Sequence, residues 1–127
     1  MSDTISIAEL AAKTRDEIKT RGWTTKMLHD VHTGNVCAVG GCGAAFYGDP
    51  TMGYDSDGNG YDTFLTTVAD RVNPGWREEM YVYSDGRVSE MSRFTFPWEA
   101  VYTWNDNASE AEVIALFDKL ANEQEAA

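Results

Sequence analysis

Two capping boxes, one near each end of the chain, constrain the fold of this sequence more than any other feature. Ser6 is followed three residues later by Glu9, and Ser109 is followed in the same way by Glu112. In a capping box the serine side chain accepts the backbone N–H of the third helical residue, and the acidic side chain of that residue accepts the N–H of the serine. Each serine therefore marks the start of a helix, so a helix is expected near each end of the chain.

The residues after each box repeat at the spacing of an amphipathic helix. The apolar stripe of the first helix comprises Ile7, Leu10, Ala11, Thr14 and Ile18. The stripe of the last helix comprises Val113, Leu116, Phe117, Leu120 and Ala121. Ile5 and Leu10 have the spacing of a hydrophobic staple, and Gly22 is a typical helix stop. Each helix therefore presents one apolar face to a core.

Two further segments lie between these helices. Residues 36–47 (VCAVGGCGAAFY) are apolar and small, which predicts either a buried helix or a tightly packed turn. Each of the three glycines in this segment costs a helix up to about 1 kcal/mol, so close packing of neighbours must offset them. Residues 63–72 have helical spacing, and Asn73-Pro74-Gly75 ends that segment.

A β-hairpin is expected after the second of these segments. Asp85-Gly86 is a favoured central pair for a two-residue type I′ turn. The cross-strand pairs that follow from this turn are Tyr83 with Val88, Met80 with Met91 and Glu78 with Arg93. Phe94 and Phe96 extend the face that carries Val88, and we expect this aromatic face to pack on the helices, because an isolated hairpin is marginally stable in water. Residues 100–104 (AVYTW) are a candidate third strand.

The chain is therefore predicted to be a small α+β protein, with helices at both ends, one or two short central helices and a small antiparallel hairpin or sheet. Its 127 residues suffice for one domain, and a hydrophobic content of 43% supports a packed core without a disulfide or a metal. We expect a single domain over residues 1–127, with a core over about 5–121 and a frayed acidic tail at 122–127.

The charge balance is strongly acidic. Against 10 basic residues stand 21 acidic ones, a formal net charge of −11. This excess argues against direct nucleic-acid binding and against a polybasic membrane contact. No run approaches the ~20 apolar residues that span a bilayer, and the polar start of the chain is unlike a secretory signal. Two cysteines are too few for a disulfide scaffold, so a cytoplasmic location with reduced thiols is expected.

The loop that begins at Asp55 resembles half of a calcium site. Asp55, Asp57 and Asn59, followed by a glycine, match the first six positions of the EF-hand loop. The match then fails, because Asp62 stands at position 8 and Thr66 replaces the bidentate glutamate of position 12. We favour a solvated turn rich in residues that tolerate left-handed backbone. The alternative is a calcium-like site with Asp55, Asp57, Asn59 and Asp62 as ligands.

Other chemistry has weaker support. His29, His32, Cys37 and Cys42 could hold zinc by type, but their spacing lacks the CxxC knuckle, so buried core cysteines are favoured. The sequence contains no nucleophile elbow, P-loop, dinucleotide fingerprint or HExxH motif. A cysteine paired with a histidine as nucleophile has no motif behind it. We therefore predict that the chain is not an enzyme.

Two of the four tryptophans are candidate partner-binding residues. Trp76 and Trp98 lie beside proline-bearing turns, where an indole is more often exposed, whereas Trp23 and Trp104 are expected to close the core. Exposed tryptophans often supply much of the affinity of a protein interface.

Several short motifs occur in a recognisable order. They are Arg21-Gly22-Trp23, Cys37-Ala38-Val39-Gly40, Trp104-Asn105-Asp106 and the capped helix that begins at Ser109. In this order they resemble a family of small proteins of unknown function from actinobacteria and their phages. The resemblance covers both ends and the cysteine segment, whereas the glycine run at 40–43 and the hairpin at 77–96 depart from the family pattern. It implies a biological setting and no reaction. Asn105 or Asp106 is expected to organise the turn before the last helix.

Together these features predict a non-enzymatic acidic accessory protein, phage-encoded in one version, that binds a host protein. The acidic surface would steer it toward a basic or nucleic-acid-binding partner, and exposed aromatic side chains would supply affinity. The alternative is a module that binds a divalent metal, such as calcium, through loop 55–62. A hydrolase or transferase with an unrecognised site is a third class. The oligomeric state stays open.

Overall fold

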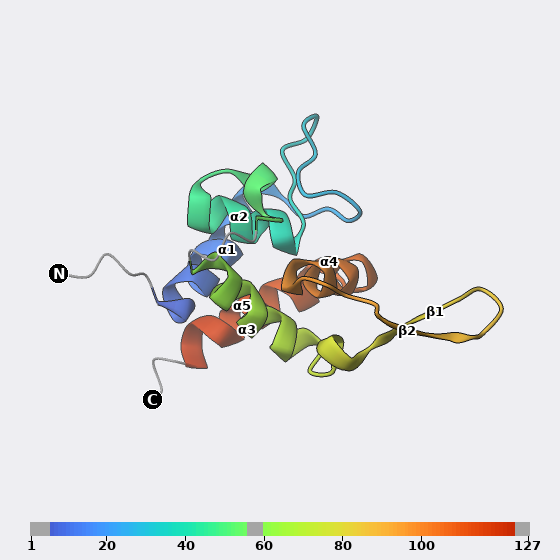
Figure 1. The fold of residues 1–127 in the computed structure, drawn as a ribbon. Coiled ribbons are helices and arrows are strands. Elements are labelled where there is room, and N and C mark those ends of the chain that lie inside the picture. The colour runs from blue at the N-terminus through green and yellow to red at the C-terminus, as the bar shows by residue number, and fades with distance from the viewer. Residues whose placement is uncertain (1–5, 56–59, 124–127) are drawn as a thin grey trace.

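The computed structural model describes residues 6–55 and 60–123 and confirms an α+β protein. Within these residues five α-helices surround the core, and one two-stranded antiparallel sheet extends from it (Figure 1). The elements in chain order are α1 (Ile7–Arg21), α2 (Ala38–Tyr47), η1 (Pro50–Met52), α3 (Tyr61–Val72), η2 (Trp76–Glu78), β1 (Met80–Val82), β2 (Val88–Ser92), α4 (Pro97–Asn107) and α5 (Glu110–Glu123).

Both predicted capping boxes are confirmed. The N–H of Glu9 donates to the Ser6 hydroxyl at 3.0 Å, and the N–H of Glu112 donates to the Ser109 hydroxyl at 3.1 Å. Each glutamate also accepts the backbone N–H of its own serine. Ile5 lies outside the described residues, and so does the staple predicted for it. Helix α5 continues to Glu123, whose carboxylate pairs with the guanidinium of Arg71, so the helix runs two residues beyond the expected end of the core.

Helix α1 packs against α5 and α2, α3 packs against α4, and α2 also contacts α4. The glycine-rich segment forms a buried helix, the first of its two predicted alternatives. A Cβ on Gly41 would lie 2.8 Å from Cγ1 of Ile18 in α1, and a Cβ on Gly40 would lie 2.0 Å from the carbonyl oxygen of Leu28. The glycines therefore allow α2 to approach its neighbours more closely than any other residue would permit.

The hairpin has a different turn and register from those predicted. A type I′ turn needs positive φ at both central residues, but in this turn only Gly86 has it, at +90°. The N–H of Tyr83 donates to the carbonyl of Arg87 at 2.9 Å, so three residues form the loop. Val82 pairs with Val88 and Met80 with Ser92, with an irregularity between them. All three predicted cross-strand pairs are therefore wrong.

Two other expectations for this region need correction. The strands extend beyond the helices, and the residues of β1 are all exposed (Figure 1). Of the predicted aromatic face, Phe94 packs in the core at 6% exposure, whereas Phe96 is 42% exposed. Residues 100–104 lie within α4 and do not form a strand. Pro97 is the first residue of that helix, and the carboxylate of Glu99 accepts the N–H groups of Thr95 and Phe96 at 2.9 and 2.7 Å. These start signals outweigh the β propensity of the residues that follow.

Candidate functional site

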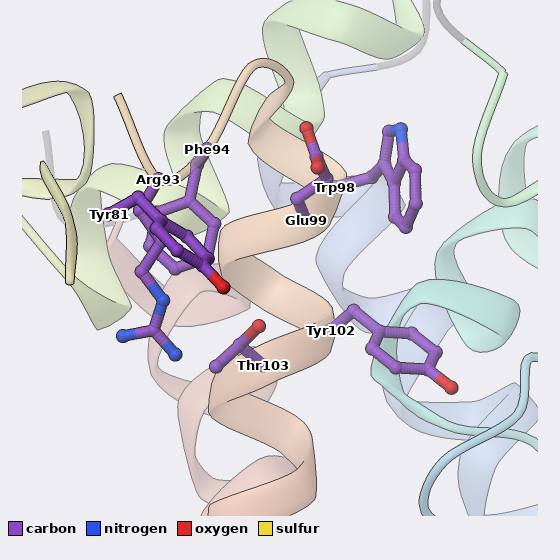
Figure 2. Close-up of a pocket in the computed structure, with 7 residues that line it drawn as sticks. All are labelled: Tyr81, Arg93, Phe94, Trp98, Glu99, Tyr102 and Thr103. Carbon is purple, nitrogen blue, oxygen red and sulfur yellow. The ribbon is translucent and has the colours of Figure 1, made fainter. Parts of the chain in front are cut away.

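A groove between the base of the hairpin and α4 is the candidate functional site (Figure 2). Its volume is about 380 Å³, within the range of ligand-binding pockets. Helix α4 contributes Trp98 with Tyr102 and Glu99 with Thr103. The members of each pair are four residues apart, so the helical repeat places them on one face. The seven residues that line the groove are Tyr81, Arg93, Phe94, Trp98, Glu99, Tyr102 and Thr103. We call this site the aromatic groove.

Aromatic rings dominate the groove and its margin. In Figure 2, Trp98 and Tyr102 lie on one side of α4, and Tyr81 and Phe94 lie on the other. The rings of Trp98 and Tyr102 meet edge to face with centroids 6.4 Å apart, and the ring of Tyr54 approaches Trp98 at 6.3 Å. Edge-to-face contact orients the rings of Trp98 and Tyr102 relative to each other, whereas Phe94 is only 6% exposed, so the ring faces that the groove presents are mainly those of Trp98, Tyr102 and Tyr81.

Both charged side chains of the groove are bound within the chain. The Arg93 guanidinium pairs with the carboxylate of Glu79 at 2.7 Å and lies 5.1 Å from the centroid of the Phe94 ring. The Glu99 carboxylate accepts the two N–H groups at the start of α4. Burial, and the nearby carboxylate of Asp106, raise the pKa of the Tyr102 phenol above its usual value, so this group is neutral at neutral pH. The groove is therefore suited to contacting side chains rather than to moving protons.

The two candidate tryptophans have different environments. Trp98 is half-buried and lines the groove. Trp76 is only 5% exposed, and its indole N–H donates to the Asp70 carboxylate at 2.9 Å. The expectation that Trp76 is exposed is wrong, because the turn after α3 folds the indole back onto the core while its N–H finds a partner at the rim.

The groove residues other than Trp98 were not predicted from the sequence. Trp98 and Tyr102 are four residues apart, a spacing that places two side chains on one helical face. The predicted strand over residues 100–104 conflicts with this spacing. Tyr81 reaches the groove only through the hairpin register, which depends on tertiary structure.

Of the four predicted calcium ligands, Asp55 and Asp62 lie in the described part of the chain. Asp57 and Asn59 lie outside the described residues. The carboxylate of Asp55 accepts a hydrogen bond from the Tyr47 hydroxyl, and Asp62 lies in the first turn of α3, where a negative charge favours the helix. Within residues 6–55 and 60–123, no three side chains of the types His, Cys, Asp and Glu gather as a metal site would require.

The cysteines are buried core residues, as predicted. Cys37 caps the start of α2, where its sulfur accepts the N–H of Gly40 at 3.4 Å, and burial raises the pKa of its thiol to about 11. Burial also raises the pKa of Cys42. His32 is exposed and His29 half-buried, so the four residues do not share one environment. A buried, protonated thiol is a poor nucleophile.

Asn105 lies where α4 meets the loop after α1 and the start of α2. Its side chain is fully buried near the end of α4. The amide oxygen accepts the indole N–H of Trp23 at 2.7 Å and the backbone N–H of Ala38 at 2.9 Å, and the amide nitrogen donates to the carbonyl of Thr24 at 3.1 Å. One side chain thus joins the end of α4 to the loop after α1 and to the start of α2.

Asp106 acts in the same region. Its carboxylate accepts the backbone N–H of Lys26 at 2.7 Å, and Lys26 has a positive φ of 65°. The expectation that Asn105 or Asp106 organises the turn before α5 is therefore wrong. That turn is organised by Ser109 and Glu112, while Asn105 and Asp106 hold the loop after α1.

Fold and groove together define a small acidic α+β domain with a helical core, an exposed hairpin and an aromatic groove at the base of the hairpin. The chain belongs to a family of unknown function, DUF6197, and the match spans residues 2–123. No curated protein and no solved structure matches the chain. None of the helices in the described part of the chain is both long enough and apolar enough to cross a membrane.

Proposed function

We propose that this chain is a non-enzymatic interaction protein of actinobacteria or their phages, which binds a host protein with a basic surface through the aromatic groove. The observation that carries the proposal is the groove itself, a surface of oriented aromatic rings beside an exposed hairpin. Tryptophan and tyrosine are the residues most enriched among those that dominate interface affinity. Their ring faces also bind arginine and lysine side chains through cation–π contacts.

The charge of the chain supports a basic partner. All six arginines form ion pairs with carboxylates of the same chain: Arg15, Arg21, Arg71, Arg77, Arg87 and Arg93. The arginines thus have acidic partners already, while the net charge of the chain is −11. Such an excess raises the rate of encounter with a positively charged surface and weakens as salt increases.

A binding role is also supported by how the polar groups are used. The thiols of Cys37 and Cys42 are buried, and burial raises their pKa. The carboxylate of Glu79 accepts from Arg93, and that of Glu99 accepts backbone N–H groups at the start of α4. An acid–base or nucleophilic site needs titratable groups that are accessible to a substrate. Protein binding requires only the shape and the rings of the groove.

Quantitative affinity capture from an actinobacterial lysate tests the proposal. The baits are the wild-type chain, a groove variant with Trp98→Ala and Tyr102→Ala, and a control variant, Val31→Ser, whose side chain is 78% exposed and lies outside the groove. A host protein retained by the wild type and the control, but lost from the groove variant and at high salt, is the expected result. If no protein depends on the groove residues, while circular dichroism shows that the groove variant is folded, the proposal is wrong.

A further inference from the structure

The outer edge of β1 is uncharged and open. Its residues Met80, Tyr81 and Val82, with Tyr83 after them, carry no charge and are each between 36% and 56% exposed. In the described part of the chain the sheet has two strands, so the edge of β1 that faces away from β2 has no strand beside it. Such an edge is a template for pairing with another strand.

The backbone geometry identifies the groups on this edge. The N–H of Tyr83 donates to the carbonyl of Arg87, and the carbonyl of Glu79 accepts the N–H of Arg93, both toward β2. Residues along an antiparallel strand direct their backbone groups alternately to one neighbour and to the other. Met80 and Val82 therefore point their N–H and C=O groups away from β2, toward the open edge.

The edge of β2 is protected by contrast. Glu90 lies in the middle of that strand and is exposed, and the register irregularity distorts the ladder between Val88 and Ser92. A central charge and a bulge are the devices by which proteins prevent edge pairing. A second β2 paired antiparallel about its centre would also place Glu90 opposite its own copy, an unfavourable pair of like charges.

We propose that two copies of this chain form a symmetric dimer in which β1 pairs antiparallel with β1 of the second copy. The register is centred on Tyr81, so that Met80 lies opposite Val82 of the second copy and each such pair exchanges both of its backbone hydrogen bonds. The product is a continuous sheet in the order β2-β1-β1-β2. It supplies the additional strands that an exposed two-stranded hairpin lacks.

The charges near the hairpin permit this pairing despite the acidity of the whole chain. Glu79 and Asp85, which flank β1, are each paired with an arginine of the same hairpin, Arg93 and Arg87. In the register centred on Tyr81, Glu79 lies opposite an uncharged tyrosine. In the register centred on Val82, Glu79 would lie opposite Asp85 of the second copy, and like charges directly opposite are unfavourable. The charge pattern therefore permits pairing with a second copy and favours the register centred on Tyr81 over the one centred on Val82.

Sedimentation velocity of the full chain over a concentration series tests this inference, which does not depend on the partner of the aromatic groove. The weight-average mass is expected to rise from that of one chain toward that of two. An interface of one strand pair is small, so the dimer should dissociate on dilution. Higher salt is expected to strengthen it by screening the repulsion between two acidic bodies, the opposite of its effect on a basic partner.

Substitutions at Val82 test whether the outer edge of β1 forms the dimer interface. Val82→Pro removes the outward N–H while the contacts of Tyr83 and Glu79 with β2 remain. Because each copy of the dimer loses one hydrogen bond from residue 82, two are lost in total, and the dissociation constant of the dimer is expected to rise about tenfold or more. Val82→Lys should have a similar effect through charge, and Val82→Thr, which keeps the N–H and the branched Cβ, should dimerise like the wild type. A mass of one chain at every concentration, assembly beyond two copies, or a dimer unaffected by Val82→Pro and Val82→Lys would overturn the proposal.

Discussion

The Trp23 indole N–H donates to the buried side-chain oxygen of Asn105 at 2.7 Å, although 82 residues separate them in the sequence. The same oxygen accepts the N–H of Ala38. Trp23, Ala38 and Asn105 belong to three of the motifs that resemble the family, so these motifs meet at one amide. Their shared location assigns them a structural role, which is to hold the loop after α1 against the start of α2 and the end of α4.

Replacing Asn105 with alanine is expected to lower the free energy of unfolding by about 3 kcal/mol, because it leaves two N–H groups and a carbonyl without their buried partner. Urea denaturation followed by tryptophan fluorescence measures the effect. Asn107→Ala is the matched control, since that side chain lies two residues further along α4 and is exposed. A loss below about 1 kcal/mol at Asn105 would contradict the role assigned to it.

Gly40→Ala is expected to destabilise the protein by about 3 kcal/mol or to prevent folding, because the new Cβ would meet the backbone carbonyl of Leu28 at 2.0 Å. The backbone cannot move aside as a flexible side chain could. Gly75→Ala is the control, as nothing lies within 4 Å of a Cβ there and its φ of −97° suits alanine. Thermal unfolding of the two variants should separate them clearly. Equal melting temperatures would show that α2 is not packed as described.

Stability is expected to fall as the pH rises from 9 to 11. The pKa of the Cys37 thiol is raised from 9.0 to about 11, so above pH 9 the thiol ionises in the unfolded chain while it stays protonated in the folded one. The unfolded state then binds fewer protons, and Cys37 alone lowers the free energy of unfolding by about 2 kcal/mol across this window, to which Cys42, whose pKa burial also raises, adds in the same direction. Urea denaturation at a series of pH values, with reductant present, measures the slope. Cys37→Ala should reduce that slope, and an unchanged slope would assign the effect to other groups.

Millimolar calcium is expected to leave the melting temperature unchanged. The Asp55 carboxylate is engaged by the Tyr47 hydroxyl, and Thr66 stands where an EF-hand loop has its bidentate glutamate. A ligand that binds only the folded state would raise the melting temperature. Differential scanning fluorimetry with calcium and then with EDTA measures this. A rise that EDTA reverses and that Asp57→Asn abolishes would instead establish the calcium-binding alternative.

Removing the hairpin is expected to leave the helical domain folded. The N–H of Arg93 donates to the carbonyl of Glu79 at 2.7 Å, so these residues are adjacent across the base of the hairpin. Residues 80–92 can therefore be replaced by a two-residue Asn-Gly turn. The helical circular dichroism signal should persist, with a melting temperature lowered by only a few degrees, because β1 contributes exposed side chains rather than core. Loss of the helical signal would show that the hairpin is part of the folding unit.

The candidate site was predictable only in part. Trp98 was singled out because an indole beside a proline is often exposed, and it lines the groove. Trp76 has the same local sequence signal and is buried, because Asp70, two residues before the end of α3, accepts its N–H. Local sequence therefore does not distinguish an exposed tryptophan from a buried one. The difference lies in what the turn brings into contact with each ring.

What the sequence determined by itself was where α1 and α5 begin. Ser6 with Glu9 and Ser109 with Glu112 define these starts through hydrogen bonds that span three residues, so no distant part of the chain is needed. Tertiary structure alone decided the burial of Trp76 and the meeting of the motifs at Asn105. These features depend on contacts between residues far apart in the chain, whose energies exceed local propensities of about 1 kcal/mol or less.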